Sequence, residues 1–314
     1  NYLISFFGRL NYSLLDRYLL TFTLRDDGSS RFSKHNRWGV FPSVALAWRI
    51  NEEKFLKNVK WLSALKLRLG YGVTGQQNLN NGDYPYLARY SYSKAGANYY
   101  FGNTEYRLIA PQAYDENLKW EETKTWNVGL DFGFLKNRIT GTFDYYYRKT
   151  DNLLNTVTAP AGTNFSNELL TNVGTLENKG IEFQLDGYIF RSKDFYWKLG
   201  TTGYINRNKI TKINKALEEI NNKNEQKSGT NLVPLPQYAE GESTTALKLV
   251  RSAGIDPATG REIYIKRNGE LTFEYDPADK VLIGDTEPRY TGTVNTNVYW
   301  KGFSVYALFN MRLG

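Results

Sequence analysis

Residues 126–147 read WNVGLDFGFLKNRITGTFDYYY. Large apolar residues take every second position of the first half: Trp126, Val128, Leu130, Phe132 and Phe134. Asn, Gly and Asp lie between them, and after Lys136-Asn137 the alternation resumes with Ile139, Gly141, Phe143, Tyr145 and Tyr147. A period of two is typical of a β-strand with unlike faces. The stretch therefore predicts a hairpin with one apolar and one polar face.

The same alternation recurs along the chain. It predicts further strands at 6–14, 18–25, 38–50, 65–73, 181–189, 195–205, 294–300 and 303–313. Short turns at 15–17, 135–137, 191–194 and 301–302, with a medium turn at 51–63, alternate with long loops at about 26–37, 75–118, 151–179 and 207–242. Tight turns on one side and long loops on the other are typical of an up-and-down membrane barrel. The sequence therefore predicts an all-β chain, part of an antiparallel transmembrane barrel, with the long loops extracellular and the short turns periplasmic.

Two interpretations fit the apolar stripe, since a soluble antiparallel sheet buries such a face and a membrane barrel turns it to lipid. The order of the loops favours the barrel. We then expect Val128, Leu130, Phe132 and Phe143 to face lipid. We expect Asp131, Thr140, Thr142 and Asp144 to face the lumen. Aromatic residues at strand ends would form interfacial girdles, as at Trp38, Trp48, Trp126, Tyr145, Tyr147 and Trp300.

Composition excludes several classes of function. The 314 residues contain no Cys and one His, which excludes a thiol nucleophile, a disulfide framework and a Cys/His zinc site. The net charge of +8 is spread along the chain, which gives little support to nucleic-acid binding. Mean hydropathy is −0.54, and no apolar run approaches the ~18 residues of a membrane helix. No basic-then-apolar leader opens the chain, so we expect a signal peptide to be absent or removed.

The one histidine, His35, follows Asp26, Asp27, Ser29 and Ser30 in RDDGSSRFSKHNRWG. Ser, His and Asp can form a hydrolytic triad, but a Gly/Ser-rich loop does not fix the geometry. We expect an exposed loop residue, with no catalytic and no metal-binding residues in the chain.

Two segments between strands carry helical signals. Residues 51–63 are expected to hold one helical turn capped by Asn51. In 212–229, Ile213, Leu217 and Ile220 share a helical face, although a solvated loop fits this Asn/Lys-rich segment as well.

Loop 75–118 is rich in aromatic and amide side chains. Tyr99, Tyr100 and Phe101 stand between Asn98 and Asn103. Flat rings beside amide donors suit a sugar ring or a peptide backbone, and they also suit packing of the loop onto its neighbours. These five residues are the candidates for contact with a ligand or a lid protein.

Several long strings of the chain resemble the SusC/RagA family of TonB-dependent outer-membrane transporters of Bacteroidota. They are LRDDGSSRF…NRWGVFPSVALAWRI (24–50), LKLRLGYGVTGQQN (65–78), the run from 118 to 154, NVGTLENKGIEFQL (172–185) and GIDPATG (254–260). The strings cover most of the chain, and they are specific for the family rather than for a substrate.

The resemblance implies a 22-stranded barrel around an N-terminal plug, a SusD-like surface lipoprotein as lid, energy from the TonB complex, and import of an oligosaccharide or oligopeptide. Residues 1–314 would be a partial barrel domain of about a dozen strands, without the plug, the TonB-contacting segments and the last strands. The location would be the Gram-negative outer membrane, with lipid around the wall. Such import needs no cofactor and no enzymatic step. The alternative function is that of a soluble all-β carbohydrate-binding or adhesion module.

Overall fold

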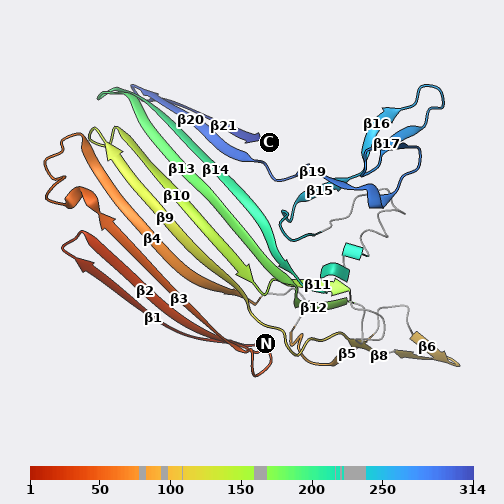
Figure 1. Cartoon of the computed structure of the whole chain (residues 1–314). Helices are drawn as coiled ribbons and strands as arrows, with labels where there is room; N and C mark the ends of the chain where they lie inside the picture. Colours follow the sequence, from red (N-terminus) through yellow and green to blue (C-terminus); the bar gives the residue numbers. More distant parts are fainter. Residues whose placement is uncertain are drawn as a thin grey trace.

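A computed structural model of the chain describes residues 1–77, 83–92, 98–107, 109–158, 168–215, 217–219, 221–222 and 238–314. Its main element is an antiparallel sheet with the strand order β1-β2-β3-β4-β9-β10-β13-β14-β20-β21 (Figure 1). The strands are β1 (Leu3–Leu14), β2 (Tyr18–Ser29), β3 (Trp38–Arg49), β4 (Leu62–Gln76), β9 (Glu121–Phe134), β10 (Ile139–Asp151), β13 (Gly174–Arg191), β14 (Phe195–Ile213), β20 (Tyr290–Trp300) and β21 (Phe303–Leu313).

Each of the ten main strands contains one of the alternating stretches of the sequence, so the prediction of an antiparallel meander is confirmed. The expected number, about a dozen, was slightly too high for this sheet. The strands have 11 to 19 residues, about twice to three times the usual length in globular proteins. The sheet is open between β1 and β21.

Short and long connections lie at opposite ends of the sheet (Figure 1). The long connections differ in extent from those expected. β2 continues to Ser29, β13 begins at Gly174 and β14 continues to Ile213, while the last long connection reaches β20 at Tyr290 instead of ending near 242. These strand ends have mostly polar residues on both faces, as in RDDGS (25–29) and GTLENKG (174–180), so the apolar alternation stops before the strand does.

Small sheets occupy the long connections. They pair β5 (Arg89–Tyr92) with β8 (Ile109–Gln112), β6 (Asn98–Phe101) with β7 (Thr104–Arg107), β11 (Leu154–Thr158) with β12 (Glu168–Asn172), β15 (Ala246–Leu249) with β19 (Val281–Asp285), and β16 (Arg251–Ile255) with β17 (Glu262–Ile265) and β18 (Leu271–Thr272). A 3₁₀ turn, η2 (Pro277–Asp279), precedes β19.

The medium turn contains the expected helical turn, as the 3₁₀ helix η1 (Ile50–Glu52), but the predicted cap is wrong. The N-cap position belongs to Arg49, which makes no side-chain cap. Asn51 lies inside the turn, and its side-chain oxygen accepts a hydrogen bond from the backbone N–H of Leu65 at 3.1 Å. Asn51 therefore joins the turn to β4 instead of capping the helix.

Buried apolar side chains gather at the loop end of the sheet. One cluster consists of Phe32, Phe41, Val73, Leu118, Trp120 and Leu170, and a second of Val157, Val173 and Leu217. Residues 215, 217–219, 221 and 222 are helical, so the helical alternative holds for this part of 212–229, whereas Ile220 lies outside the described residues. In the described part of the chain, no helix has the length and apolarity needed to cross a membrane.

Candidate functional site

The pairing register carries the alternation across the whole sheet and gives it two chemically different faces. On the polar face, Asp131 of β9 pairs with Lys66 of β4 and with Thr142 of β10. On the apolar face, the next residue, Leu130, pairs with Leu67 and with Phe143. A shift of one residue in any strand would exchange the faces, so this register decides which side chains meet.

An ionic network spans three strands of the polar face. Arg68 of β4 binds Asp131 of the neighbouring β9, with 2.8 Å between nitrogen and oxygen. The same guanidinium reaches past β9 to Asp144 of β10 at 2.9 Å, and Lys66 adds a contact of 3.1 Å to Asp131. Gly129 lies between the two ends of the longer bridge, since it pairs with both Arg68 and Asp144. A Cβ at Gly129 would lie 2.7 Å from the guanidinium carbon.

A second charged group follows on the next two strands. Asp186 of β13 lies opposite Thr140 of β10 in the pairing register. Its carboxylate forms an ion pair of 2.9 Å with Lys198 of β14. The amide of Gln184, which pairs with Thr142, donates to the other oxygen of Asp186 at 2.7 Å. The four polar positions selected from the sequence thus share one face and join a row of charged and amide side chains.

A soluble sheet buries its apolar face and exposes its polar face. In this sheet the apolar face is the more exposed of the two. On the apolar face, Val128 and Phe143 keep 46% and 45% of their surface exposed, and Leu130 and Phe132 are half-buried. On the polar face, the side chains of Asp144 and Asp131 are only 17% and 27% exposed. No set of fully buried side chains covers the apolar face within the described residues, because the buried clusters lie at the loop end.

Aromatic rings gather near both ends of the strands. Trp38 stacks on Phe6 at 6.2 Å near the loop end, and Trp48 stacks on Tyr18 at 6.3 Å near the short turns. Trp126 contacts Tyr71 and Tyr147, while Trp300 is exposed. Trp38 and Trp48 are ten residues apart on β3. At ~3.4 Å per residue, that spacing is about 34 Å along the strand.

One carboxylate ties the short-turn ends of β2 and β3 together. Glu53 accepts hydrogen bonds from the Tyr18 hydroxyl at 2.6 Å and from the Trp48 indole at 3.0 Å, and its second oxygen binds Arg17 at 2.9 Å. The Tyr18 hydrogen bond, followed by those of Trp48 and Arg17, holds the pKa of the Glu53 carboxyl below its usual value. The turn is therefore anchored best while Glu53 is ionised.

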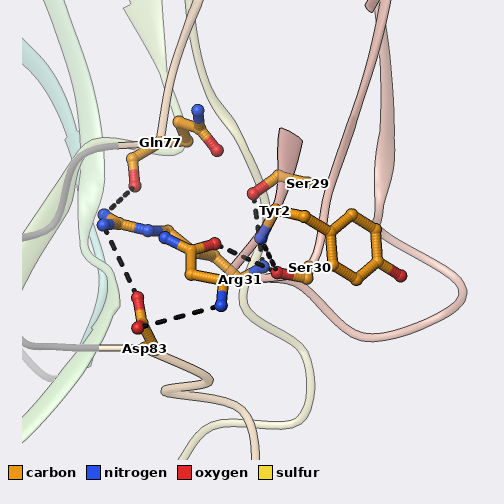
Figure 2. Close-up of polar contacts among 7 residues, drawn as sticks. Tyr2, Ser29, Ser30, Arg31, Gln77 and Asp83 are labelled. Carbon is orange, nitrogen blue, oxygen red and sulfur yellow. Dashed lines mark hydrogen bonds and ion pairs between the residues drawn. The ribbon is translucent and has the colours of Figure 1, made fainter. Parts of the chain in front are cut away.

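At the loop end, polar contacts fix the connection that follows β2 (Figure 2). The Ser30 hydroxyl accepts from the backbone N–H of Tyr2 at 2.9 Å. Arg31 donates to the carbonyl of Gln77 at 3.1 Å and contacts Asp83 at 3.8 Å. Arg31 thus connects the β2–β3 loop to Gln77, directly after β4, and to Asp83.

Sequence reasoning missed an amphipathic hollow of about 510 Å³ at the loop end of the polar face. Phe41 of β3 lies on the polar face with Ser43, whereas the other large apolar residues of β3 lie on the opposite face. This exception to the alternation could have indicated the hollow. The lining includes Thr23, Arg25, Asp27, Phe41, Gln76 and Trp120. Arg25 and Asp27 form an ion pair of 2.7 Å. The hollow therefore combines apolar rings with charged and amide groups.

The aromatic residues selected from loop 75–118 lie in the β6–β7 hairpin. Tyr99, Tyr100 and Phe101 lie on β6, and they are 54%, 63% and 66% exposed. Phe101 contacts Tyr99 at 4.6 Å and Tyr106 of β7 at 5.6 Å between ring centroids. Asn98 pairs with Arg107 through the backbone, and Asn103 lies exposed in the turn. The three rings expose most of their area, which leaves them available for contact with another molecule.

His35 is exposed, and three of the four neighbouring residues considered with it, Asp27, Ser29 and Ser30, are engaged elsewhere. The Ser29 hydroxyl accepts from the backbone of Arg31, the Ser30 hydroxyl accepts from Tyr2, and Asp27 binds Arg25. The arrangement gives no support to a Ser-His-Asp triad.

The fold and its polar face are those of a known class of membrane barrel. The sequence profile described as "TonB dependent receptor-like, beta-barrel" matches residues 1–309. The chain belongs to the TonB-dependent receptor-like β-barrel family, and the resemblance noted in the sequence is confirmed.

Two curated relatives illustrate the relationship. TonB-dependent receptor SusC of Bacteroides thetaiotaomicron is 58% identical over 213 residues, which cover 68% of this chain and 21% of SusC. TonB-dependent receptor P3 of Formosa agariphila is 32% identical over 99% of this chain and 32% of its own length. The chain thus spans a third or less of the length of these relatives.

Solved structures of the RagAB peptide importer have a fold similar to that of this chain. The RagAB peptide importer in its closed-closed state matches with a TM-score of 0.81 at 27% identity, over 98% of this chain and 33% of the matched chain. The open-open state of the same importer gives a TM-score of 0.79 at 28% identity.

Proposed function

We propose that this chain forms part of the barrel wall of an outer-membrane transporter that imports a large nutrient, an oligosaccharide or an oligopeptide, with energy from the TonB complex. The observation that carries the proposal is the reversed exposure of the two faces. Large apolar side chains of the strands are exposed, while charged side chains crowd the opposite face. Lipid is the solvent that stabilises such an arrangement, because exposed apolar surface of this extent promotes aggregation in water.

The polar face then lines the lumen. The bridges from Arg68 to Asp131 and Asp144 and the Lys198–Asp186 pair place hydrogen-bonding groups where a polar nutrient passes. They also bind strands to one another laterally. A soluble binding module would need a core beneath the apolar face, and the buried clusters at the loop end do not supply one.

The aromatic belts support the same orientation. At a barrel tilt of 35–45°, their separation of about 34 Å along β3 becomes about 24–28 Å along the membrane normal, which matches the ~25 Å apolar band of outer-membrane barrels. The long connections, with the β6–β7 hairpin, belong outside the cell in this orientation, and the turns at 135–137 and 191–194 belong in the periplasm.

The β6–β7 hairpin is the candidate for first contact with a nutrient or with a SusD-like lid lipoprotein. Exposed rings offer a large contact area at low entropic cost. RagAB is named a peptide importer, whereas the name of SusC states no substrate, so both nutrient classes are retained in the proposal.

Replacing Tyr99, Tyr100 and Phe101 together by Ala in the full-length transporter tests this function. Strains that grow only by taking up the oligosaccharide or peptide should lose growth, while the barrel still reaches the outer membrane in folded, heat-modifiable form. The matched control replaces Tyr264 and Tyr275, an aromatic pair 5.5 Å apart in the last long connection. Normal growth and normal co-purification of a lid lipoprotein with the triple variant would contradict the role of the hairpin. Extraction of the native protein without detergent would contradict the transporter itself.

A further inference from the structure

The apolar face contains a hollow near its short-turn end. It extends over β10, β13, β14 and β20 and has a volume of about 580 Å³, within the ~300–1,000 Å³ of ordinary small-molecule sites. Its lining comprises six aliphatic side chains, among them Ile139, Leu199 and Val294, together with two glycines, Tyr188, Thr201 and the charged Arg138 and Asp186. The carboxylate of Asp186 is paired with Lys198. Aliphatic walls of this kind offer dispersion contacts and no hydrogen bonds to an occupant.

The hollow exists because β13 has a glycine where its neighbours have large side chains. Gly187 pairs with Ile139 on one side and with Leu199 on the other. A Cβ at Gly187 would meet no atom within 4 Å. The gap lies between two groups of rings. The first is the cross-strand pair of Phe143 and Phe183, and the second is Phe190 stacked on Trp197 at 6.2 Å.

A cation lies at the short-turn end of the hollow. Arg138, one of its lining residues, is exposed and follows the turn between β9 and β10. The pairing register between β13 and β14 shifts between Tyr188 and Phe190. Arg138 hydrogen-bonds to the backbone at this shift: Nε donates to the carbonyl of Tyr188 at 2.9 Å, and Nη2 donates to the carbonyl of Ile189. Within the described part of the chain, Nη1 of Arg138 makes no protein hydrogen bond. The guanidinium is therefore held in place with donors to spare.

We propose that this hollow binds one anionic phospholipid of the surrounding membrane, with an acyl chain against Gly187 and the phosphate at Arg138. Shape and charge both point to this occupant, since the walls match a hydrocarbon chain and a guanidinium forms strong charge-assisted hydrogen bonds with phosphate. The proposal rests on the proposed function, because it requires the apolar face to lie in a bilayer. Anionic head groups are attracted to basic residues at the edge of the membrane.

Native mass spectrometry of the full-length protein tests the site. Protein purified from outer membranes in detergent and stripped of lipid is titrated with dioleoyl phosphatidylglycerol or dioleoyl phosphatidylcholine. Both lipids have a phosphate, but the choline cation of phosphatidylcholine offsets the attraction of that phosphate to Arg138. We therefore expect one retained phosphatidylglycerol, bound about fivefold more tightly than phosphatidylcholine. Gly187→Leu fills the hollow and should abolish retention. Val294→Phe narrows it from β20 and serves as a second filling variant.

The controls are matched to each variant. Gly8→Leu also adds a side chain to an apolar-face glycine whose Cβ would meet nothing within 4 Å, and it should leave lipid retention unchanged. Arg138→Gln should remove the preference for phosphatidylglycerol, whereas Lys301→Gln, a cation in another short turn, should not. Equal retention by the wild type and both filling variants, or equal binding of both lipids, would contradict the site while the detergent-requiring barrel stands. A protein that is soluble without detergent would contradict the proposed function first.

Discussion

Arg68 and Asp144 are hydrogen-bonded at 2.9 Å although their strands, β4 and β10, are not neighbours. The bridge crosses β9 above Gly129, where no side chain stands in its way. It closes a network with Asp131 and Lys66, so three consecutive strands share charges on one face. Because the Arg68 and Asp144 side chains are only 32% and 17% exposed, each needs the other to compensate for lost hydration.

Gly129→Val should break this bridge. The new Cβ would lie 2.7 Å from the guanidinium carbon of Arg68, so the Arg68 and Asp144 side chains must move apart. Loss of their charge-assisted hydrogen bond is expected to cost about 1.5–3 kcal/mol. We expect a lower midpoint temperature for heat-induced unfolding, followed by gel mobility. Gly8→Val adds the same side chain where the Cβ meets nothing within 4 Å, and it should unfold at the wild-type temperature. Equal midpoints for the two variants would refute a structural role of the bridge.

A charge on the apolar face should be costly. Phe143→Arg is expected to destabilise the barrel by ~2–4 kcal/mol, the cost of Arg at the bilayer midplane. Thr142→Arg, at the next residue on the polar face, should cost far less because its side chain stays hydrated. Denaturant titration in lipid vesicles measures both variants, and a similar loss in each would argue against the assignment of the faces.

Glu53 should make stability depend on pH. Its pKa is lower in the folded protein, so the contribution is fully present above the unfolded pKa of ~4.3 and is lost as pH falls through the folded value. Wild type should therefore be more stable than Glu53→Gln near neutral pH, and the difference should shrink on acidification below about pH 4.3. Thermal unfolding over a pH series measures this, with Glu52→Gln as control. A constant difference at all pH values would count against the ionised carboxylate as the anchor.

The two ends of the sheet should lie on opposite sides of the membrane. Epitope tags at Gly102, in the β6–β7 turn, and within 152–173, between β10 and β13, should be labelled on intact cells. Tags within 135–137 and 191–194 should be labelled only after the outer membrane is opened. Labelling of a short turn and a neighbouring long connection in the same intact cells would be incompatible with the orientation.

Local sequence was sufficient for the main sheet, because alternation is a property of each strand alone and the runs around Leu67, Leu130 and Phe143 are long. It could not reveal the Arg68–Asp144 bridge, which depends on the register of strands 76 residues apart in sequence. The same holds for the hollow around Phe41 and Trp120, whose residues come from distant segments. The small sheets of the last long connection were missed because β15 to β19 are short and interrupted by turns, which gives no sustained period. Asn51 was assigned as a cap because the residue type favours caps, whereas a tertiary bond to Leu65 fixes it.

One face of the sheet should meet lipid and the other should meet water. Spin labels placed singly at 126–134 in the full-length protein, reconstituted in bilayers, measure this directly through access to oxygen and to a water-soluble nickel chelate. We predict a period of two, with labels at 128, 130 and 132 more accessible to oxygen and labels at 129, 131 and 133 more accessible to nickel. Equal access at 130 and 131, or access without a period of two, would contradict it.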